Sequence, residues 1–521
     1  MPLNLKCCIG ATLVPLGLTM AIPAHAEWLE ARSEHFTVVA DMPEAELRSR
    51  TLKLERFDSM LRHVLSPDST IPVTVYYVEG LDAVQDAMGD KSGQVAGFYN
   101  VSAQRAYAVV PEKLPFHVED FTPQIVLLHE YTHHMLLANA SVFMPGWAQE
   151  GLAEMFATAK LQDDGSVVIG DKNDSRGQAM FGMSRWSVRR LLASDLDPPK
   201  GDERIEAYSR GWALIHYLWM SGQRQGQYIR FIEELNKGTE PIAAGEAAFG
   251  DLDALNTEIN RYINRHVYRL AEFTPAELGE VAPIAIRPLG TDEAAILRYR
   301  IASSVGVTDK TAGRLAERAR PVGNRFPDSL SVQTAMAEIL HDAEDYDGAD
   351  AAADRVLAQE PENLMGLAYK GRVAVRRALA ANDEAAVARA RSWFRRAARA
   401  HQDSALPFML YYDSFTALGQ TPPPDAVSGL YRAVVLVPQD TSLRIRAALA
   451  LIREGQVARA RSVIAPAAFT PEEGADNKAL ELVRAMDETQ DPQALLAKAA
   501  ELKLDRTNDF VDPPEDEEED G

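Results

Sequence analysis

The segment from Leu127 to Lys160 restricts the fold of this chain more than any other, because it places ionisable side chains inside two apolar stretches. His129 and His133 are four residues apart, so on a helix both imidazoles project from one face and can hold one metal ion. Glu130 lies close enough to reach a water on that ion. The alternative is two core histidines bonded to backbone or water, with Glu130 solvated. Each group left unsatisfied there would cost about 1–3 kcal/mol.

A third ligand would decide between these alternatives. Glu150 belongs to a second helical stretch that begins after a break at Pro145 and Gly146. If the two helices pack together, Glu150 can complete a two-His, one-Glu site with an open position for water, which is the arrangement of a catalytic zinc site. Glu154, one turn later, is then expected to accept a hydrogen bond from a ligand imidazole. The spacing also permits the reverse assignment, with Glu154 as the ligand and Glu150 as its helper.

The start of the chain predicts its compartment. Residues 1–26 are predicted to be a signal peptide: an almost wholly apolar run from Cys7 to Pro23 follows Lys6 and leads to Ala24-His25-Ala26, a small-x-small pattern typical of signal peptide cleavage. We expect a mature chain that begins at Glu27 and is periplasmic or secreted; an uncleaved anchor is the alternative. The two cysteines, Cys7 and Cys8, would leave with the signal, so no disulfide framework is expected. A net charge of −22 argues against nucleic acid as a partner.

Periodicity divides the mature chain into parts. Strand and helix patterns alternate over residues 34–88, as in an α/β or α+β subdomain. Residues 93–111 predict two strands joined by a polar turn at Ser102 to Gln104. Residues 121–265 read as almost entirely helical. An extended linker is predicted to follow, with bounds at 276–290.

The last third repeats itself, with a proline closing three of its four units and Pro327 preceding Pro361 by 34 residues. That period is typical of tetratricopeptide repeats, which these units resemble; a generic helical array with the same packing is the alternative. The repeats are predicted over residues 291–500, followed by an acidic, solvated tail at 501–521. A binding role for that tail is also open. The positions expected to pack are Ala349/Ala353/Val356, Ala390/Phe394/Ala397, Ala426/Leu430/Ala433 and Ala458/Ser462/Ala465.

Three motifs carry a further resemblance. "HEYTH" followed by "WAQEGLAE" resembles the gluzincin metallopeptidases of the peptidase MA clan, in which a HExxH helix precedes a helix with a Glu-Gly-x-Ala ligand motif. "YSRGWALIHYLW", which begins at Tyr208, is similar to the Tyr-x-Lys-Gly helix of aminopeptidase N-like enzymes, with Arg210 in place of the usual lysine. The mature start is like that of secreted bacterial peptidase MA-like proteins that carry tetratricopeptide repeats. The resemblance implies one zinc ion on His129, His133 and Glu150.

The same resemblance implies Glu130 as general base and Tyr208 as oxyanion donor. Zinc lowers the pKa of its water to about 7, so a carboxylate can take the proton and later pass it to the leaving amine. A donor at the developing oxyanion is worth roughly 3–4 kcal/mol. The alternative for Tyr208 is a half-buried tyrosine on an amphipathic helix. His134 and His216 lack the spacing of ligands and are expected to be surface or core histidines.

The predicted strand pair offers a place for substrate. In related enzymes an edge strand in this region pairs with an extended peptide, and residues 93–100 or 106–110 could serve here. The Gly-x-Met-Glu-Asn stretch by which aminopeptidases hold a free amine is missing. Endopeptidase and exopeptidase action are therefore both open.

The combined prediction is an α+β, predominantly α-helical chain. A gluzincin-like catalytic domain over residues 27–275, with a small mixed sheet, would precede a tetratricopeptide-like solenoid. The expected function is that of a secreted or periplasmic zinc metallopeptidase acting on peptides or proteins, with the repeats recruiting substrate or a protein partner. The competing hypothesis is a non-catalytic binding or assembly protein whose metal site is structural or inactive.

Overall fold

The structure is a computed structural model, and it describes residues 28–67, 71–88, 97–113, 122–138, 143–171, 186–194, 203–264, 268–468 and 477–510. The predicted signal peptide, residues 1–26, lies outside this part of the chain, as do residues 511–521 of the predicted tail. Within the described residues, every helix is too short or too polar to cross a lipid bilayer.

A mixed six-stranded sheet organises the N-terminal part, in the order β4-β5-β3-β2-β1-β9. β2, β3 and β5 run parallel, whereas β1 pairs antiparallel with β2 and β9, and β4 pairs antiparallel with β5. The runs rich in β-branched and aromatic residues form strands where the sequence predicts them. The strands are β1 (Leu29–Arg32), β2 (Phe36–Ala40), β3 (Val73–Val78), β4 (Phe98–Val101), β5 (Ala106–Pro111) and β9 (Ala285–Pro288).

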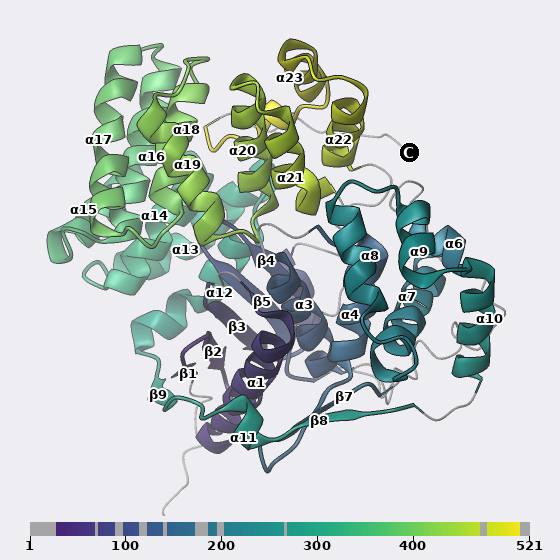
Figure 1. Ribbon diagram of the computed structural model, residues 1–521. Helices are drawn as coiled ribbons and strands as arrows, with labels where there is room; N and C mark the ends of the chain where they lie inside the picture. Colours follow the sequence, from purple (N-terminus) through teal and green to yellow (C-terminus); the bar gives the residue numbers. More distant parts are fainter. Residues whose placement is uncertain are drawn as a thin grey trace, which may run out of the picture.

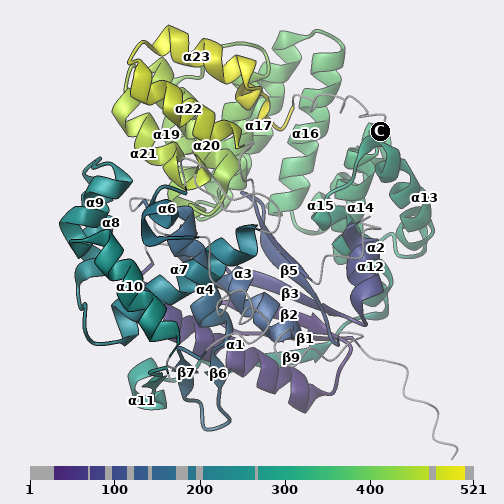
Figure 2. The same cartoon turned by 90° about the vertical axis from the view of Figure 1, so that its right-hand side faces the viewer.

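Helices cover both faces of this sheet (Figures 1 and 2). α1 (Glu44–Leu65) and α3 (Pro123–Leu137) lie on one face, where Val38 and Val75 join the main core. α2 (Leu81–Met88) and α12 (Thr291–Val305) lie on the other, where Val39 and Tyr76 belong to a separate cluster. Alternate strand residues therefore serve two cores, as the two-residue period of a strand requires.

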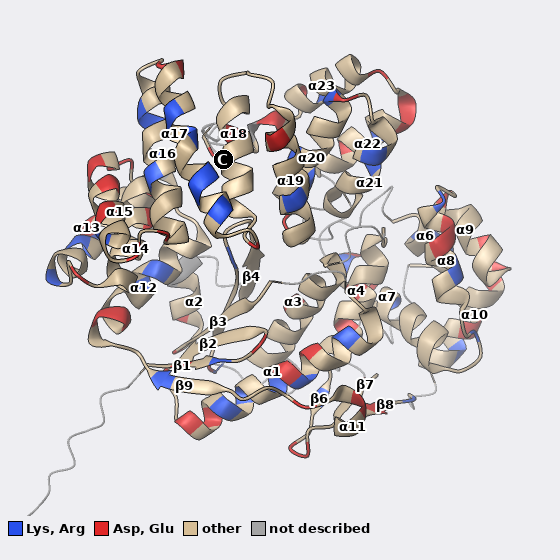
Figure 3. Cartoon of the chain, turned by 60° about the vertical axis from the view of Figure 1, so that its left-hand side comes forward, with Lys and Arg blue, Asp and Glu red and all other residues tan. Residues whose placement is uncertain are grey.

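Acidic and basic residues lie close together along α1 (Figure 3). Arg48 pairs with Glu44 at 2.9 Å and Arg50 with Glu46 at 2.6 Å, each four residues apart. Such exposed pairs add little stability, but they keep their face of α1 in water while the opposite face enters the core.

The rest of the N-terminal part is mostly helical, as predicted, but it also contains a second sheet of three strands. Its strand order is β6-β7-β8, and β6 and β7 interrupt the region that the sequence predicts to be almost wholly helical. These strands could not be predicted because they are only two or three residues long and show no readable alternation of apolar and polar residues. The elements are α4 (Gly146–Ala157), β6 (Lys160–Leu161), β7 (Val167–Ile169), α6 (Val188–Leu192), α7 (Glu203–Met220), α8 (Gln227–Asn236), α9 (Pro241–Phe249), α10 (Leu252–Ile263), β8 (Ala271–Phe273) and α11 (Pro275–Leu278).

The predicted linker at 276–290 differs in the structure. It contains β9, which pairs with β1 through four residues from Ala285 to Pro288 and forms one edge of the six-stranded sheet. The chain thus returns to the N-terminal sheet before it enters the helical array.

A C-terminal array of helices follows, in which helices adjacent in sequence pack against each other. Its packing joins small and apolar side chains in three clusters along the array. The helices after α12 are α13 (Asp309–Arg325), α14 (Leu330–Asp342), α15 (Tyr346–Gln359), α16 (Leu364–Ala380), α17 (Glu384–Ala400), α18 (Leu406–Thr416), α19 (Pro424–Leu436), α20 (Thr441–Arg453), α21 (Val457–Ala468), α22 (Lys478–Glu488) and α23 (Pro492–Glu501).

The predicted packing positions are buried in the first three units, but the fourth is shifted by two residues. In α21 the predicted Ala465 is buried, but Ala458 and Ser462 are exposed. Ala460, Ile464 and Ala467 are buried instead, with the same offsets of four and seven. Alanine occurs on both faces of this helix, so the pattern of small residues does not distinguish one register from the other.

The predicted tail also begins later than expected. After α23 the chain forms a 3-10 turn at Leu504–Arg506, and Phe510 is buried at 4% exposure in the core of the array. Residues 501–510 are therefore part of the packed structure.

Candidate functional site

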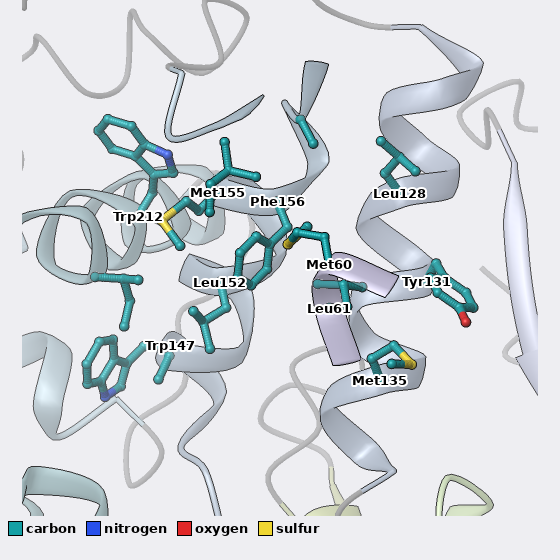
Figure 4. Close-up of a cluster of buried hydrophobic side chains, with 14 of the residues drawn as sticks. Met60, Leu61, Leu128, Tyr131, Met135, Trp147, Leu152, Met155, Phe156 and Trp212 are labelled. Atoms are coloured by element: carbon teal, nitrogen blue, oxygen red, sulfur yellow. The ribbon is translucent and has the colours of Figure 1, made fainter. Parts of the chain in front are cut away.

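The helix α3 carries the HExxH sequence. Thr122 caps its N-terminus by accepting a hydrogen bond from the Ile125 amide, and Pro123 occupies the first turn, where its missing N–H costs nothing. Leu128, Tyr131 and Met135 anchor the helix in the core that Figure 4 shows. Because these three residues share one face of α3, His129 and His133 lie on a neighbouring face, which is directed toward α4.

The helix α4 is buried along its whole length. Trp147, Leu152 and Phe156 enter the same core (Figure 4). On its other side α4 touches α7 backbone to backbone, because a Cβ on Gly151 would lie 2.7 Å from the carbonyl carbon and oxygen of Gly211. Glycine at this position therefore lets α7 press against the residue next to Glu150.

The two helices bring three predicted ligands together. The Nε2 atoms of His129 and His133 are 3.2 Å apart. Oε1 of Glu150 lies 3.3 Å from His133 Nε2, and its Oε2 lies 3.6 Å from His129 Nε2. Donors placed tetrahedrally at about 2.0–2.1 Å from one zinc ion are about 3.3–3.4 Å from each other. The observed separations match that spacing closely.

Burial makes a cation at this point chemically reasonable. Glu150 is only 3% exposed, and its Oε2 has no hydrogen-bond partner among the described residues. A buried carboxylate oxygen without a donor is costly, and a cation between it and the two imidazoles would relieve that cost. The side chains of His129 and His133 remain 19% and 11% exposed, so the site is open to solvent on the histidine side. The donor set therefore fits a divalent metal ion.

Two further carboxylates lie on the helices that carry the donor set. Glu130 is half-buried on α3 beside His129, and Glu154 is buried one turn beyond Glu150 on α4. The cluster of three donors contains Glu150 and not Glu154. Of the two assignments left open by the sequence, the geometry favours Glu150 as the ligand.

Tyr208 lies on α7, one turn before Gly211, where α7 crosses α4. It is half-buried and packs against the main core. Arg210 points away from this crossing: its guanidinium donates to Asn260 at 2.9 Å and to Asn256 at 2.6 Å, both on α10. Burial lowers the pKa of Arg210 to about 10. Arg210 therefore fastens α7 to α10.

Sequence reasoning missed a polar cluster beneath α3. Tyr131 donates a hydrogen bond to Asp58 Oδ1 at 2.6 Å, and Arg62 donates to Asp58 Oδ2 at 2.7 Å. His35 Nδ1 lies 2.8 Å from Glu55 and 3.2 Å from Asp58. The group His35, Glu55 and Asp58 could also hold a metal by spacing alone, but Arg62 and Tyr131 already occupy both oxygens of Asp58. We interpret it as a hydrogen-bonded cluster that ties α1 to the metal-ligand helix.

The two remaining histidines near these motifs are core residues. His134 is fully buried between Tyr99 of β4, whose hydroxyl hydrogen-bonds its Nδ1, and the stacked ring of Tyr131. His216 is fully buried on α7, with its Nδ1 2.7 Å from the Tyr262 hydroxyl. Burial lowers the pKa of both, to about 3 for His134. The sequence leaves surface and core open for these residues, and the structure places both in the core.

The strand β4 borders the site. It is the end strand of the sheet next to β5 and contacts α3. Of the two candidate strands for an extended peptide, β5 is already paired on both sides by β3 and β4, so its part of the prediction, residues 106–110, is wrong. The other candidate strand, residues 93–100, corresponds to β4 in the structure. Its first part, residues 93–96, lies outside the described part of the chain.

Fold and site together define an α+β chain with a His-His-Glu donor set on two packed helices and a C-terminal helical array. A family model described as "Protein of unknown function (DUF1570)" matches residues 125–242. The match spans α3, α4 and α7, which carry all three sequence motifs, and includes neither the six-stranded sheet nor the array. No curated protein matches the chain.

Proposed function

We propose that this protein is a zinc-dependent peptidase of the gluzincin type. The observation that carries the proposal is the convergence of His129, His133 and Glu150 from two helices, with donor atoms 3.2–3.6 Å apart. Zinc is proposed because two imidazoles and one carboxylate with an open fourth position are typical of its catalytic sites.

A bound zinc ion would supply Lewis-acid chemistry, acidifying a water and polarising the carbonyl of the scissile bond. The side chains of the protein would do the rest. Glu130, next to His129 on α3, would accept the proton from the attacking water and deliver it to the leaving amine. Tyr208 would donate a hydrogen bond to the oxygen that becomes negative in the transition state.

The proposed substrate is an extended peptide paired with the outer edge of β4, which is an end strand of the sheet among the described residues. Main-chain pairing of this kind needs little side-chain specificity, so it fits a range of sequences. Tyr99 on β4 touches His134 on α3, so a peptide along this strand would run beside the metal-ligand helix. The absence of the Gly-x-Met-Glu-Asn motif leaves no glutamate in that motif to bind a free amine, which supports internal cleavage as readily as removal of terminal residues.

The setting of this activity is also proposed. The N-terminal sequence favours export to the periplasm or the medium, and the helical array, which we interpret as tetratricopeptide-like, would recruit a protein substrate or partner. The alternative is a binding protein in which the array is functional and the metal is structural or inactive. The buried charged contacts of the array, described below, favour a binding role for it, and this role is compatible with a peptidase.

Two variants test the proposal together. Wild-type protein is expected to contain about one zinc per chain and to cleave a peptide library. Glu130→Gln, a change of similar shape, should retain the metal but lower kcat roughly 100- to 10,000-fold. Glu150→Ala should lose both metal and activity. Metal analysis and peptidase assays on all three proteins distinguish the outcomes, and a Glu130→Gln variant with wild-type turnover would refute the proposed chemistry.

A further inference from the structure

The last residues of the packed chain lie inside the helical array as a short bound peptide would. After the 3-10 turn at Leu504–Arg506, the chain runs back from α23 to α16 and α18. Asn508, Asp509 and Phe510 each make defined contacts there. We call the residues that surround them the cradle: Arg372 and Arg376 on α16, Phe394 on α17, Asp413 on α18 and Arg446 on α20.

The acidic side chain of Asp509 is held by a two-pronged contact. Arg372 Nε and Nη2 donate to its two oxygens at 2.9 and 2.7 Å, a geometry specific for carboxylates. Arg372 is only 8% exposed. A buried guanidinium without a carboxylate would be costly, so this arginine needs an acidic group in front of it.

The backbone of the segment is held as well. Arg376 donates to the carbonyl oxygens of Asp509 at 3.2 Å and Phe510 at 3.4 Å. The Asp509 amide donates to Asp413 Oδ2 at 3.0 Å. Contacts to main-chain atoms do not depend on the sequence of the bound segment. The cradle therefore selects through only a few side-chain positions.

The cradle exists independently of the segment in one respect. Asp413 is 1% exposed and receives Arg446 Nε at 3.1 Å on both of its oxygens, so these two charges already compensate each other. Phe510 fills an apolar place beside Phe394, with ring centroids 6.0 Å apart. The cradle thus combines the Arg372 guanidinium, the Asp413 carboxylate that accepts from a backbone amide, and an apolar position for a ring beside Phe394.

The segment is held by the contacts of three residues, Asn508 to Phe510, and it forms neither a helix nor a strand. Between the buried anchors Leu504 and Phe510, the residues whose side chains are described are exposed or only half-buried. One aromatic side chain and a set of polar contacts hold the end of the chain in place. Such a segment can leave without unfolding a helix, which distinguishes it from the helices that build the array.

We propose that the cradle is a peptide-binding site for a protein partner that presents an extended segment with an acidic residue followed by an aromatic residue. The Asn508-Asp509-Phe510 segment of this chain is its resident occupant, and a partner segment competes with it. Because the resident segment is tethered, it competes at an effective concentration on the order of millimolar, so partners must bind tightly or be displayed locally.

The cradle also touches the N-terminal sheet. Arg372 Nη1 donates to Gln104 Oε1 at 3.1 Å, and Gln104 lies in the turn between β4 and β5. An occupant that draws Arg372 toward itself would alter this second contact. The inference does not depend on the proposed peptidase activity, because binding alone tests it.

The test uses the full-length chain and a fluorescent peptide with the sequence LDRTNDFVDP, residues 504–513. Asp509→Asn keeps the shape of the segment and removes its charge, while the double variant Asp509→Ala/Phe510→Ala removes both side chains that fill the cradle. We expect both variants to bind the peptide at least about tenfold more tightly than the wild type, as measured by anisotropy, because the resident competitor is weakened. A peptide in which alanines replace Asp509 and Phe510 should not bind.

Arg372→Gln, introduced into the double variant, should abolish the gain. The matched control is Arg399→Gln in the same background, because Arg399 is an exposed arginine on α17 and its loss changes the net charge equally. The proposal is overturned if the folded variants bind the peptide no better than the wild type, or if the Arg399 control weakens binding as much as Arg372→Gln. Unfolding of both segment variants would overturn it too, since the segment would then be a permanent structural strap.

Discussion

The contact between Gly151 and Gly211 allows a quantitative test of how the ligand helices are held. In Gly151→Ala the new methyl group would lie 2.7 Å from the Gly211 carbonyl, about 0.7 Å inside the 3.4 Å at which ordinary contact begins. Both partners are backbone, so the strain cannot be relieved by a side-chain rotation. The helices α4 and α7 must separate. Overpacking of this kind costs about 1–3 kcal/mol, against about 1 kcal/mol gained from alanine in a helix.

The net effect should therefore be a loss of up to about 2 kcal/mol, or a fall in Tm of up to roughly 8 °C for a domain of this size. Metal affinity should respond more strongly, because Glu150 is adjacent and metal–ligand distances tolerate only about 0.2 Å. A roughly 10- to 100-fold weaker zinc affinity is expected. Competition with a chelator measures the affinity and differential scanning fluorimetry measures the Tm.

Gly313→Ala is the matched control, because Gly313 is also helical but has no atom within 4 Å of the position of a Cβ. It should leave zinc affinity unchanged and raise stability slightly, by up to about 1 kcal/mol. If Gly151→Ala binds zinc as the wild type does and melts at the same temperature, the close approach of α4 and α7 does not position Glu150 and the reasoning fails.

The remaining predictions concern the site and its support. Tyr208→Phe should lower kcat about 100- to 1,000-fold with zinc content and KM unchanged, and equal turnover would remove the tyrosine from the mechanism. Tyr131→Phe should destabilise the fold by about 1–3 kcal/mol, because Asp58 loses a buried donor; chemical denaturation measures it, with Tyr411→Phe, whose hydroxyl contact at 3.2 Å is exposed, as control. The hydrogen bond that His35 donates to Glu55 raises the pKa of His35 above 6.5, although burial opposes it. Stabilisation by protonated His35 is therefore present below pH 6.5 and lost as the pH rises through the raised pKa. Tm of His35→Gln should fall less steeply than that of the wild type toward alkaline pH, and parallel curves would exclude this group.

The sequence predicts the meeting of α3 and α4 because the ionisable groups of both helices need a common partner in an apolar setting. The long strands and α1 are also predictable, since their periodicity is clear over many residues. Other features leave no such trace. β9 is only four residues long and reads as a linker, and its role depends on pairing with β1, which is more than 250 residues earlier.

Three further features of the structure depend on non-local contacts in the same way. The register of α21 depends on which alanines face the neighbouring helices, and the local pattern serves both faces. Residues 508–510 look like part of an acidic tail by composition. In the structure, however, Arg372 compensates the charge of Asp509, and the ring of Phe510 is buried beside Phe394. Asp58 likewise appears as one polar residue in an amphipathic helix until Tyr131 meets it across the core.

The turn between β4 and β5 is fixed at both ends, which has a mechanical consequence. The Ala103 amide donates to Asp440, the N-cap of α20, at 2.8 Å. Arg105 donates to both oxygens of Glu338 on α14 at 2.6 Å. The array therefore binds the β4–β5 hairpin, whose first strand borders the His-His-Glu group. Any tilt of the array must therefore bend or shift β4 unless these contacts break. A movement of the array would thus be transmitted through β4 to α3, which contacts this strand.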